Sequence, residues 1–349
     1  MNRKEKIKLF QDVFAPKGDE KILFLVDTPH DNIKDNKKWK DRRKMVKEWY
    51  NIFKEMGAKK GFLVNLLEYK ATGMHNSAIP EEIINATYKS NLIIAITEFS
   101  ASAPLLSVCT SKNTIARCAS MPEAEKRMEE TAFKANYKDV RKYAVAIKKR
   151  LDDAVGAEIM FSTGDKLYID LRNRVAESDT GDCTKKGQFI NFPSGEGYIA
   201  PYEAAQDEVD EYGISKTEGI WPVMYDGELV KYIITNNRIV EIIGKGKKAR
   251  EMSIFFEEND TRRNVAELGI GCNQKAVIGG NPTEDEKVGL HIAYGMSTHL
   301  GGKVKSDMHD DLCYSKGCPV EATKVILINP DGTKTEIIQN AEVRYDLLE

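Results

Sequence analysis

The run Lys21-Ile22-Leu23-Phe24-Leu25-Val26 (KILFLV) decides the fold class of this chain of 349 residues. A continuous apolar run of this length is typical of a parallel strand that is buried on both faces. Two further apolar runs, 62–67 and 92–96, follow at intervals long enough for a helix between successive strands. The resulting strand–helix–strand–helix–strand order predicts an open, doubly wound parallel sheet.

The segments around these strands have helical spacing. The first ends at Gly57, which we expect to cap it. Its apolar face consists of Trp39, Met45, Val46, Trp49, Phe53 and Met56. Pro80 is expected to open a short helix that runs to Tyr88, and Thr110 to Cys118 is expected to start another. No glycine-rich phosphate-binding motif follows any of the strands, so the first half predicts no dinucleotide or nucleotide site.

The pattern changes in the second half of the chain. A helical stretch from Glu123 to Leu151 precedes short strands that begin near Ala157, and one helix near Lys247 to Glu257 interrupts them. The turn-forming groups between these strands are Thr163-Gly164-Asp165, Asp226-Gly227, Asn236-Asn237 and Asp331-Gly332. We therefore place a boundary near residue 155, between an α/β domain (1–155) and a β-rich, mostly antiparallel domain (156–349).

Composition excludes several classes of protein. Lys and Arg total 52 against 54 Asp and Glu, so no basic surface for nucleic acid is expected. The longest apolar runs are strand-sized and the first ten residues lack the apolar core of a signal peptide, so we expect a cytoplasmic protein that does not bind membranes. The six cysteines have no paired CxxC spacing and are expected to be reduced thiols.

The stretch KVGLHIAYGMSTHLGGKVKSDMHDDL, residues 287–312, contains three of the five histidines of the chain. On a strand, His291 would lie on a face of small residues, opposite to the apolar face. His309 and Asp311 are two positions apart, so on an extended chain both side chains point to one side. A structural role for His291 alone is open, but the pair of His309 and Asp311 favours a metal site.

Two further carboxylates stand in apolar or glycine-rich segments: Glu196 in NFPSGEG (191–197) and Glu267 in NVAELGIG (264–271). A buried, unpaired carboxylate is costly, so it would protonate, pair with a cation or bind a metal. An exposed strand edge is the alternative for Glu267. With Asp311 these residues would supply three negative charges, which two divalent ions and a bridging hydroxide neutralise. Zinc, cobalt or manganese suits such ligands.

Three motifs in this order resemble the thermophilic metallo-aminopeptidases of the aminopeptidase T (leucyl aminopeptidase T) family. They are Asn-x-Pro-x-Gly-Glu at 191–196, AELGIG at 266–271, and LHIAYG at 290–295 followed by His309-x-Asp311; TSKNTIARCASMP at 110–122 resembles the same family upstream. The metal ligands that this resemblance implies are Glu196, Glu267, His291, His309 and Asp311. It also implies two domains, a homodimer, and a metal-binding hydrolase that releases N-terminal residues from short peptides.

The chain departs from that family at one catalytic position. Ser297-Thr298-His299 occupies the place of the family's tyrosine, and Tyr294 comes too early to match it. His299 would then be either a hydrogen-bond donor to the substrate or a simple loop histidine. Glu196 or Glu267 would transfer the proton during peptide hydrolysis by a hydroxide bound between two metal ions.

Two other functions stay open. The ring-opening dihydroxypyridine dioxygenases are a neighbouring branch of similar length, in which two histidines and one carboxylate hold a single Fe(II) ion. His291, His309 and Asp311 would supply that set. A relative that has lost catalysis and binds peptides is the third possibility. Our first expectation is the dinuclear metallo-aminopeptidase.

Overall fold

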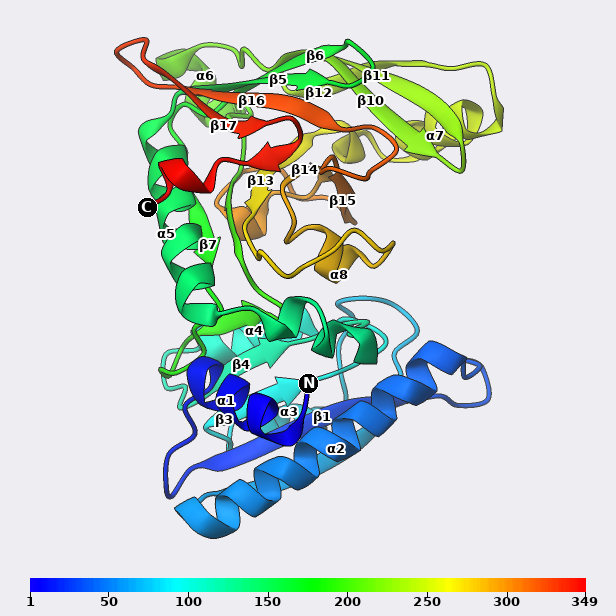
Figure 1. Cartoon of the computed structure of the whole chain (residues 1–349). Helices are drawn as coiled ribbons and strands as arrows, with labels where there is room; N and C mark the ends of the chain where they lie inside the picture. The colour runs from blue at the N-terminus through cyan, green and yellow to red at the C-terminus, as the bar shows by residue number, and fades with distance from the viewer. The chain divides into compact units, whose positions relative to one another are not determined.

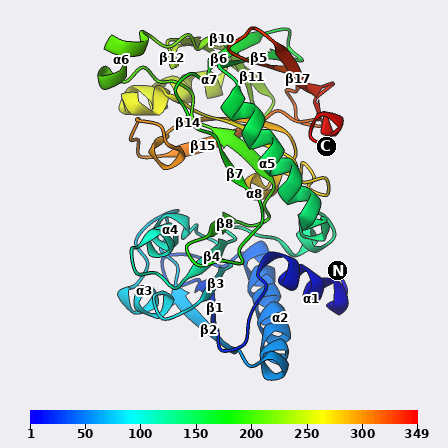
Figure 2. The same cartoon turned by 90° about the vertical axis from the view of Figure 1, so that its left-hand side faces the viewer.

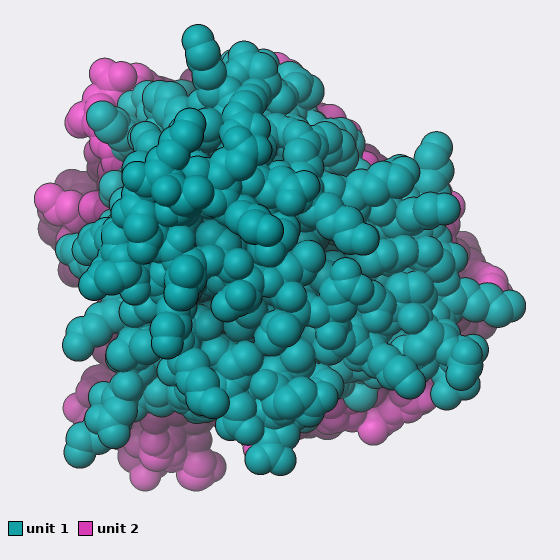
Figure 3. All heavy atoms as spheres, turned by 90° about the horizontal axis from the view of Figure 1, so that it is seen from below, with its two compact units in different colours: residues 1–141, 179–194, 273–277 teal, residues 142–178, 195–272, 278–349 magenta.

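A computed structural model describes all residues of the chain, 1–349, and divides into two compact units. Unit 1 comprises residues 1–141, 179–194 and 273–277, and unit 2 comprises residues 142–178, 195–272 and 278–349. Figure 3 colours the atoms of unit 1 teal and those of unit 2 magenta. The chain first passes from unit 1 to unit 2 within helix α5 (Tyr137–Asp153). The boundary near residue 155 between an α/β domain and a β-rich domain stays a prediction.

Unit 1 is built on a five-stranded parallel sheet. Its strands are β1 (Lys21–Thr28), β2 (Leu63–Lys70), β3 (Leu92–Ala95), β4 (Arg117–Ser120) and β8 (Phe189–Asn191). Their order across the sheet is β2-β1-β3-β4-β8, and every neighbouring pair is parallel. The chain adds β2 on one side of β1 and β3 on the other, which confirms the predicted open, doubly wound sheet.

Helices cover both faces of this sheet (Figure 2). On the face of α1 and α2, Phe10 belongs to the same buried cluster as Phe24 of β1, and on the face of α3 and α4, Leu105 belongs to the same buried cluster as Leu25 of that strand. Residues 24 and 25 point to opposite faces, as in any strand, and both are buried, which explains the continuous apolar run. The helices of the unit are α1 (Arg3–Val13), α2 (Lys37–Lys60), α3 (Glu81–Thr87), α4 (Ser102–Thr110), η1 (Lys126–Glu129) and η2 (Ala132–Lys134).

Two predicted helix limits are wrong. Helix α2 runs through Gly57 and ends at Gly61, whose φ of 90° is the left-handed conformation that glycine adopts most readily at a helix end. Gly57 is instead a buried position where a Cβ would stand 3.0 Å from the ring of Phe62. The helix expected from Thr110 onward lies upstream as α4, with Pro104 in its first turn, and the following buried residues pair with β3 as strand β4.

Unit 2 contains an eight-stranded antiparallel sheet in the order β12-β11-β10-β6-β5-β16-β17-β18 (Figure 1). Its strands are β5 (Gly156–Phe161), β6 (Lys166–Asp170), β10 (Glu218–Tyr225), β11 (Glu228–Thr235), β12 (Arg238–Ile243), β16 (Ala322–Ile328), β17 (Lys334–Gln339) and β18 (Glu342–Val343). All four predicted turn groups connect successive antiparallel strands of this sheet, which confirms those turns. The predicted helix near residues 247–257 is α7 (Lys247–Glu258).

A second, five-stranded sheet completes unit 2, in the order β15-β14-β13-β9-β7. Its strands are β7 (Glu177–Asp179), β9 (Glu196–Ile199), β13 (Val265–Gly271), β14 (Leu290–Gly295) and β15 (His309–Cys313). One face packs into the core of the unit, where Leu268 belongs to the same buried cluster as Trp221 of β10 and Ile147 of α5. The remaining helices are α6 (Gln206–Tyr212), α8 (Pro282–Asp285), η3 (Asp260–Arg263), η4 (Thr298–Leu300) and η5 (Tyr345–Leu347).

The predicted fold class, a parallel α/β sheet joined to mostly antiparallel β-rich structure, is therefore confirmed. All six cysteines are free, as expected. None of the helices combines the length and the apolar composition that crossing a membrane requires.

Candidate metal centre

One face of the five-stranded sheet carries the polar residues that the sequence singled out. Leu268 and Ile270 of β13 pack into the core. Because successive strand residues point to opposite faces, Glu267 lies on the other face, away from that core. By register, this second face also carries Glu196 of β9, His291 of β14, and His309 and Asp311 of β15. Antiparallel pairing thus brings together five residues that are far apart in the sequence.

Glycines make room for these side chains. Gly269 is paired with His291, and a Cβ on Gly269 would stand 2.6 Å from Cδ2 of that imidazole and closer still to its Nε2. Gly271 is paired with Glu196, and a Cβ there would stand 2.5 Å from the backbone nitrogen of Val288. The two glycines of the Glu-Leu-Gly-Ile-Gly motif therefore leave the space that the imidazole and the segment before β14 occupy.

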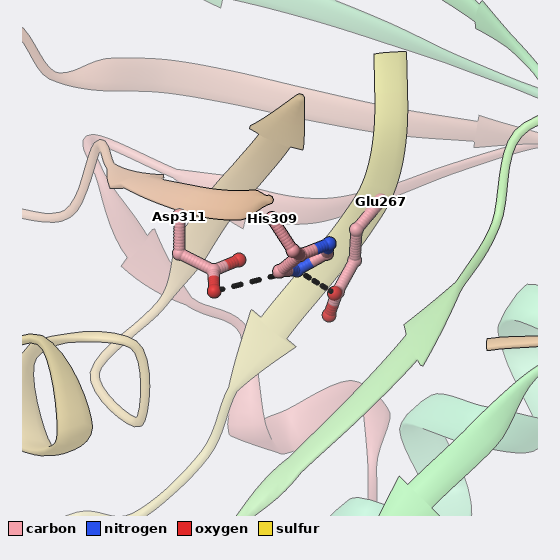
Figure 4. A group of neighbouring side chains, drawn as sticks. All are labelled: Glu267, His309 and Asp311. Atoms are coloured by element: carbon pink, nitrogen blue, oxygen red, sulfur yellow. Dashed lines mark ion pairs between the residues drawn. The ribbon is translucent and has the colours of Figure 1, made fainter. Parts of the chain in front are cut away.

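Glu267, His309 and Asp311 converge closely enough to hold a metal ion. The Nε2 atom of His309 lies 3.1 Å from Oε2 of Glu267 and 3.5 Å from Oδ2 of Asp311. One possible ligand atom from each residue lies within 4.8 Å of the other two. Figure 4 shows the three side chains pointing toward one another from β13 and β15.

The other oxygen of Glu267 faces a different imidazole. Oε1 of Glu267 lies 3.3 Å from Nε2 of His291, and the same nitrogen is 3.6 Å from Oε2 of Glu196. Glu267 therefore stands between the two histidines with one oxygen toward each. The strand-edge alternative for Glu267 is wrong, because β13 is an inner strand of the sheet and Glu267 is only 6% exposed.

The cluster stabilises positive charge. Burial raises the pKa of Glu267, but the imidazoles of His291 and His309 outweigh burial and hold that pKa well below its usual range. Burial lowers the pKa of His291, whereas Glu267 and Glu196 raise it, and the balance is a pKa of about 9. Burial likewise lowers the pKa of His309, whereas the neighbouring Asp311 raises it, and the balance is a pKa well above the usual value. Carboxylates that favour a nearby cation are what a metal site requires.

Three buried polar atoms of the cluster have no hydrogen-bond partner in the protein: Oε2 of Glu196, Nδ1 of His291 and Oδ1 of Asp311. A buried polar atom without a partner costs about 1–3 kcal/mol. Two of the three are carboxylate oxygens and the third is an imidazole nitrogen, and both atom types are ligands of divalent transition metals. The residues present therefore fit a metal ion.

Neighbouring groups orient the cluster. The Nδ1 atom of His309 lies 2.7 Å from the carbonyl oxygen of Met296; donation of its N–H there leaves Nε2 directed at the carboxylates. His299 lies edge-on to His309, with ring centroids 4.7 Å apart, and so stands beside the cluster. Its catalytic role stays a prediction. Tyr294 points away from the cluster, and its hydroxyl donates to Asp310 at 2.8 Å.

Sequence reasoning missed Lys287. The local sequence Glu284-Asp285-Glu286-Lys287 has the composition of a solvated surface segment, yet the side chain of Lys287 is 0% exposed. Its Nζ atom lies 2.6 Å from Oε1 of Glu196 and 2.7 Å from Oε1 of Glu286. The available signal was its position three residues before an apolar strand that carries a histidine.

A pocket of about 230 Å³ adjoins this centre in unit 2. Asp311 and Cys313 of β15 line it, together with Gly280, with Asp285 of α8, and with apolar residues of β10, α8, β15 and the segment after β15. These apolar residues are Val223, Met224, Pro282, Leu312, Tyr314, Pro319 and Val320. The pocket thus combines an apolar wall with two carboxylates, Asp285 and Asp311, and the second of these belongs to the candidate metal group.

Comparisons with known proteins find similarity of structure without similarity of sequence. No protein-family model matches the chain, and no curated protein matches it. The solved structure of 2,5-dihydroxypyridine dioxygenase from Pseudomonas putida KT2440 is similar over 98% of this chain and 98% of its own chain, with a TM-score of 0.66 and 14% sequence identity. At this identity the similarity establishes a shared fold, while the resemblance to aminopeptidases has no support among the family models or curated proteins.

Proposed function

We propose that this chain is a metal-dependent dioxygenase that uses one Fe(II) ion to open a dihydroxylated aromatic ring. The observation that carries the proposal is the convergence of Glu267, His309 and Asp311, whose possible ligand atoms lie within 4.8 Å of one another. The shared fold with a dihydroxypyridine dioxygenase over nearly the whole of both chains supports the same reaction class. The aminopeptidase, our first expectation from sequence, is the less supported function.

The protein's own groups have separable tasks in such a reaction. Glu267, His309 and Asp311 would hold the ion, with Glu267 in the place expected for His291, and the ion would supply the one-electron chemistry with dioxygen that zinc lacks. The carbonyl of Met296 fixes the ring of His309. Glu196 presents an oxygen without a hydrogen-bond partner, so it is the group best placed to accept a proton from a substrate hydroxyl.

The adjoining pocket suits the proposed substrate. Its volume of about 230 Å³ lies below the range of roughly 300–1,000 Å³ typical of drug-sized ligands, so it suits a single substituted ring. Its apolar wall would cover the faces of an aromatic ring, and Asp311 at its border would bring the ring hydroxyls to the metal.

The test is oxygen uptake by purified protein loaded anaerobically with Fe(II). With 2,5-dihydroxypyridine or a related dihydroxylated ring, we expect one iron per chain, consumption of one O₂ per ring opened, and both oxygen atoms in the product. Zinc-loaded protein and the Asp311→Ala variant are the controls and should consume no oxygen. Failure of the iron-loaded protein to consume oxygen with any dihydroxylated aromatic ring would refute the proposal.

A second candidate, the dinuclear hydrolase, is favoured by one specific observation. The two oxygens of Glu267 contact different imidazoles, as a carboxylate that bridges two ions would. Two ions per chain after zinc or cobalt loading, with hydrolysis of amino-acid anilides, would favour the hydrolase over the dioxygenase. The homodimer and the cytoplasmic location remain predictions, and size-exclusion chromatography with light scattering tests the first.

A further inference from the structure

Lys287 is a charged residue buried inside the unit that holds the metal centre. Its side chain is 0% exposed, although an ammonium is costly to bury without compensation. The compensation comes from Oε1 of Glu196 at 2.6 Å and Oε1 of Glu286 at 2.7 Å from Nζ. The lysine is therefore joined directly to a residue of the candidate metal centre.

The backbone around Lys287 is placed by the sheet beneath it. Gly271 pairs with Glu196, and the segment that contains Lys287 packs onto Gly271, where a Cβ would stand 2.5 Å from the nitrogen of Val288. Only a glycine at this position permits that approach. Register and packing thus fix the ammonium beside the carboxylate.

The contact has a defined effect on Glu196. One oxygen is held by the ammonium, so the other, Oε2, is directed toward Nε2 of His291 at 3.6 Å and has no hydrogen-bond partner. We propose that Lys287 is a positioning residue that acts through Glu196, holding Oε1 so that Oε2 is presented to the metal centre and its substrate. This inference rests on the proposed function, because that function makes Glu196 part of the working site.

A double-mutant cycle in iron-loaded protein tests the inference. Lys287→Met and Glu196→Gln should each lower kcat/KM for ring opening at least tenfold. In the Glu196→Gln background, Lys287→Met should lower kcat/KM by less than a further twofold, because the lysine then has no carboxylate to orient. Effects that multiply in the double variant, or wild-type activity in Lys287→Met, would overturn the proposal. If Lys287→Met does not fold, Lys287→Gln keeps an N–H donor toward Glu196 and should lose less activity than Glu196→Gln.

The chain offers a matched control in unit 1. Lys6 is another buried lysine, 3% exposed, with Nζ 2.9 Å from Oε2 of the buried Glu129. Lys6→Met should lower the thermal midpoint as Lys287→Met does, and should leave kcat/KM within twofold of wild type. An equal loss of activity in both variants would mean that Lys287 has only a structural role.

Binding of Co²⁺ without substrate separates this inference from the proposed reaction. Removal of an ammonium beside the carboxylates should tighten Co²⁺ binding at least fivefold in Lys287→Met, since like charges no longer repel. A disordered site would instead bind Co²⁺ more weakly. If no aromatic ring is opened but Co²⁺ binds more tightly to Lys287→Met, the proposed function fails while the contact of Lys287 with the centre stands. Weaker or unchanged Co²⁺ binding would overturn the inference.

Discussion

Replacement of Gly269 by alanine should damage the metal centre without removing any polar group from it. A Cβ at this position would stand 2.6 Å from Cδ2 of His291 and closer to Nε2, whereas ordinary contacts begin near 3.4 Å. The imidazole would therefore have to retreat by about 1 Å or more. Gly269 lies in a strand without a positive φ, so alanine adds no backbone strain and the whole effect is steric.

The size of the effect follows from two opposing terms. Crowding a packed interior lowers the free energy of unfolding by about 1–3 kcal/mol. Alanine also reduces the conformational entropy of the unfolded chain, which raises the free energy of unfolding by about 0.4–1 kcal/mol. We expect a net loss of about 1–2 kcal/mol in the free energy of unfolding. Displaced from its 3.3 Å contact, His291 would no longer orient Glu267, and loss of an orienting partner weakens metal binding about 10–100-fold.

Isothermal titration with Co²⁺ and urea denaturation of metal-free protein measure the two quantities. Gly156→Ala is the matched control, because a Cβ there would meet the ring of Tyr168 at 2.6 Å, on the other sheet of the unit. It should lose comparable stability and keep its Co²⁺ affinity. A Gly269→Ala protein whose Co²⁺ affinity stays within twofold of wild type would refute the link between this glycine and the centre.

Three further predictions concern charge. His309→Ala should weaken Co²⁺ binding at least about a hundredfold, whereas His299→Ala should change it less than about tenfold, as calorimetry would measure. In metal-free protein the raised pKa of His291, about 9, contributes about 3 kcal/mol to the free energy of unfolding. This contribution is complete below pH 6.5 and is lost as the pH rises through 9, which denaturation at several pH values should show. Over the same pH range the affinity for Co²⁺ should rise, because protons no longer compete for the imidazole. Arg117→Met should lower the free energy of unfolding by about 3–5 kcal/mol, because it leaves the carboxylate of Glu20 without the guanidinium that binds it at 2.8 and 3.0 Å. The Co²⁺ affinity of this variant should stay unchanged.

The parallel sheet could be predicted because burial of both faces makes its strands continuous apolar runs. The same rule fails for β4, which is only four residues long and begins with Arg117. That arginine is buried by an ion pair with Glu20 and by backbone carbonyls from distant segments, and none of these partners can be read from the local sequence. Local spacing therefore placed a helix where tertiary pairing makes a strand.

The residues of the centre were predictable by their chemistry, but their arrangement was not. A carboxylate in an apolar segment needs a partner, and Glu267 could be singled out for that reason. Lys287 was missed because a lysine needs the same compensation only when it is buried, and its acidic neighbours resemble a surface segment. Chemistry thus identifies groups that must be compensated, while register and packing decide which group compensates which.

The position of Glu267 shows how much depends on register. Val265 and Glu267 are two residues apart and would share a face in a regular strand. The pairing of β13 with β14 shifts between them, so that Val265 lies opposite Tyr294 and packs in the core, while Glu267 lies opposite Ala293 on the other face. This bulge at Ala266 turns the carboxylate out of the core and places it between two imidazoles. Deleting Ala266 would remove this extra residue and make Val265 and Glu267 adjacent in a regular strand, so Val265 should stay in the core and Glu267 should still face His291 and His309.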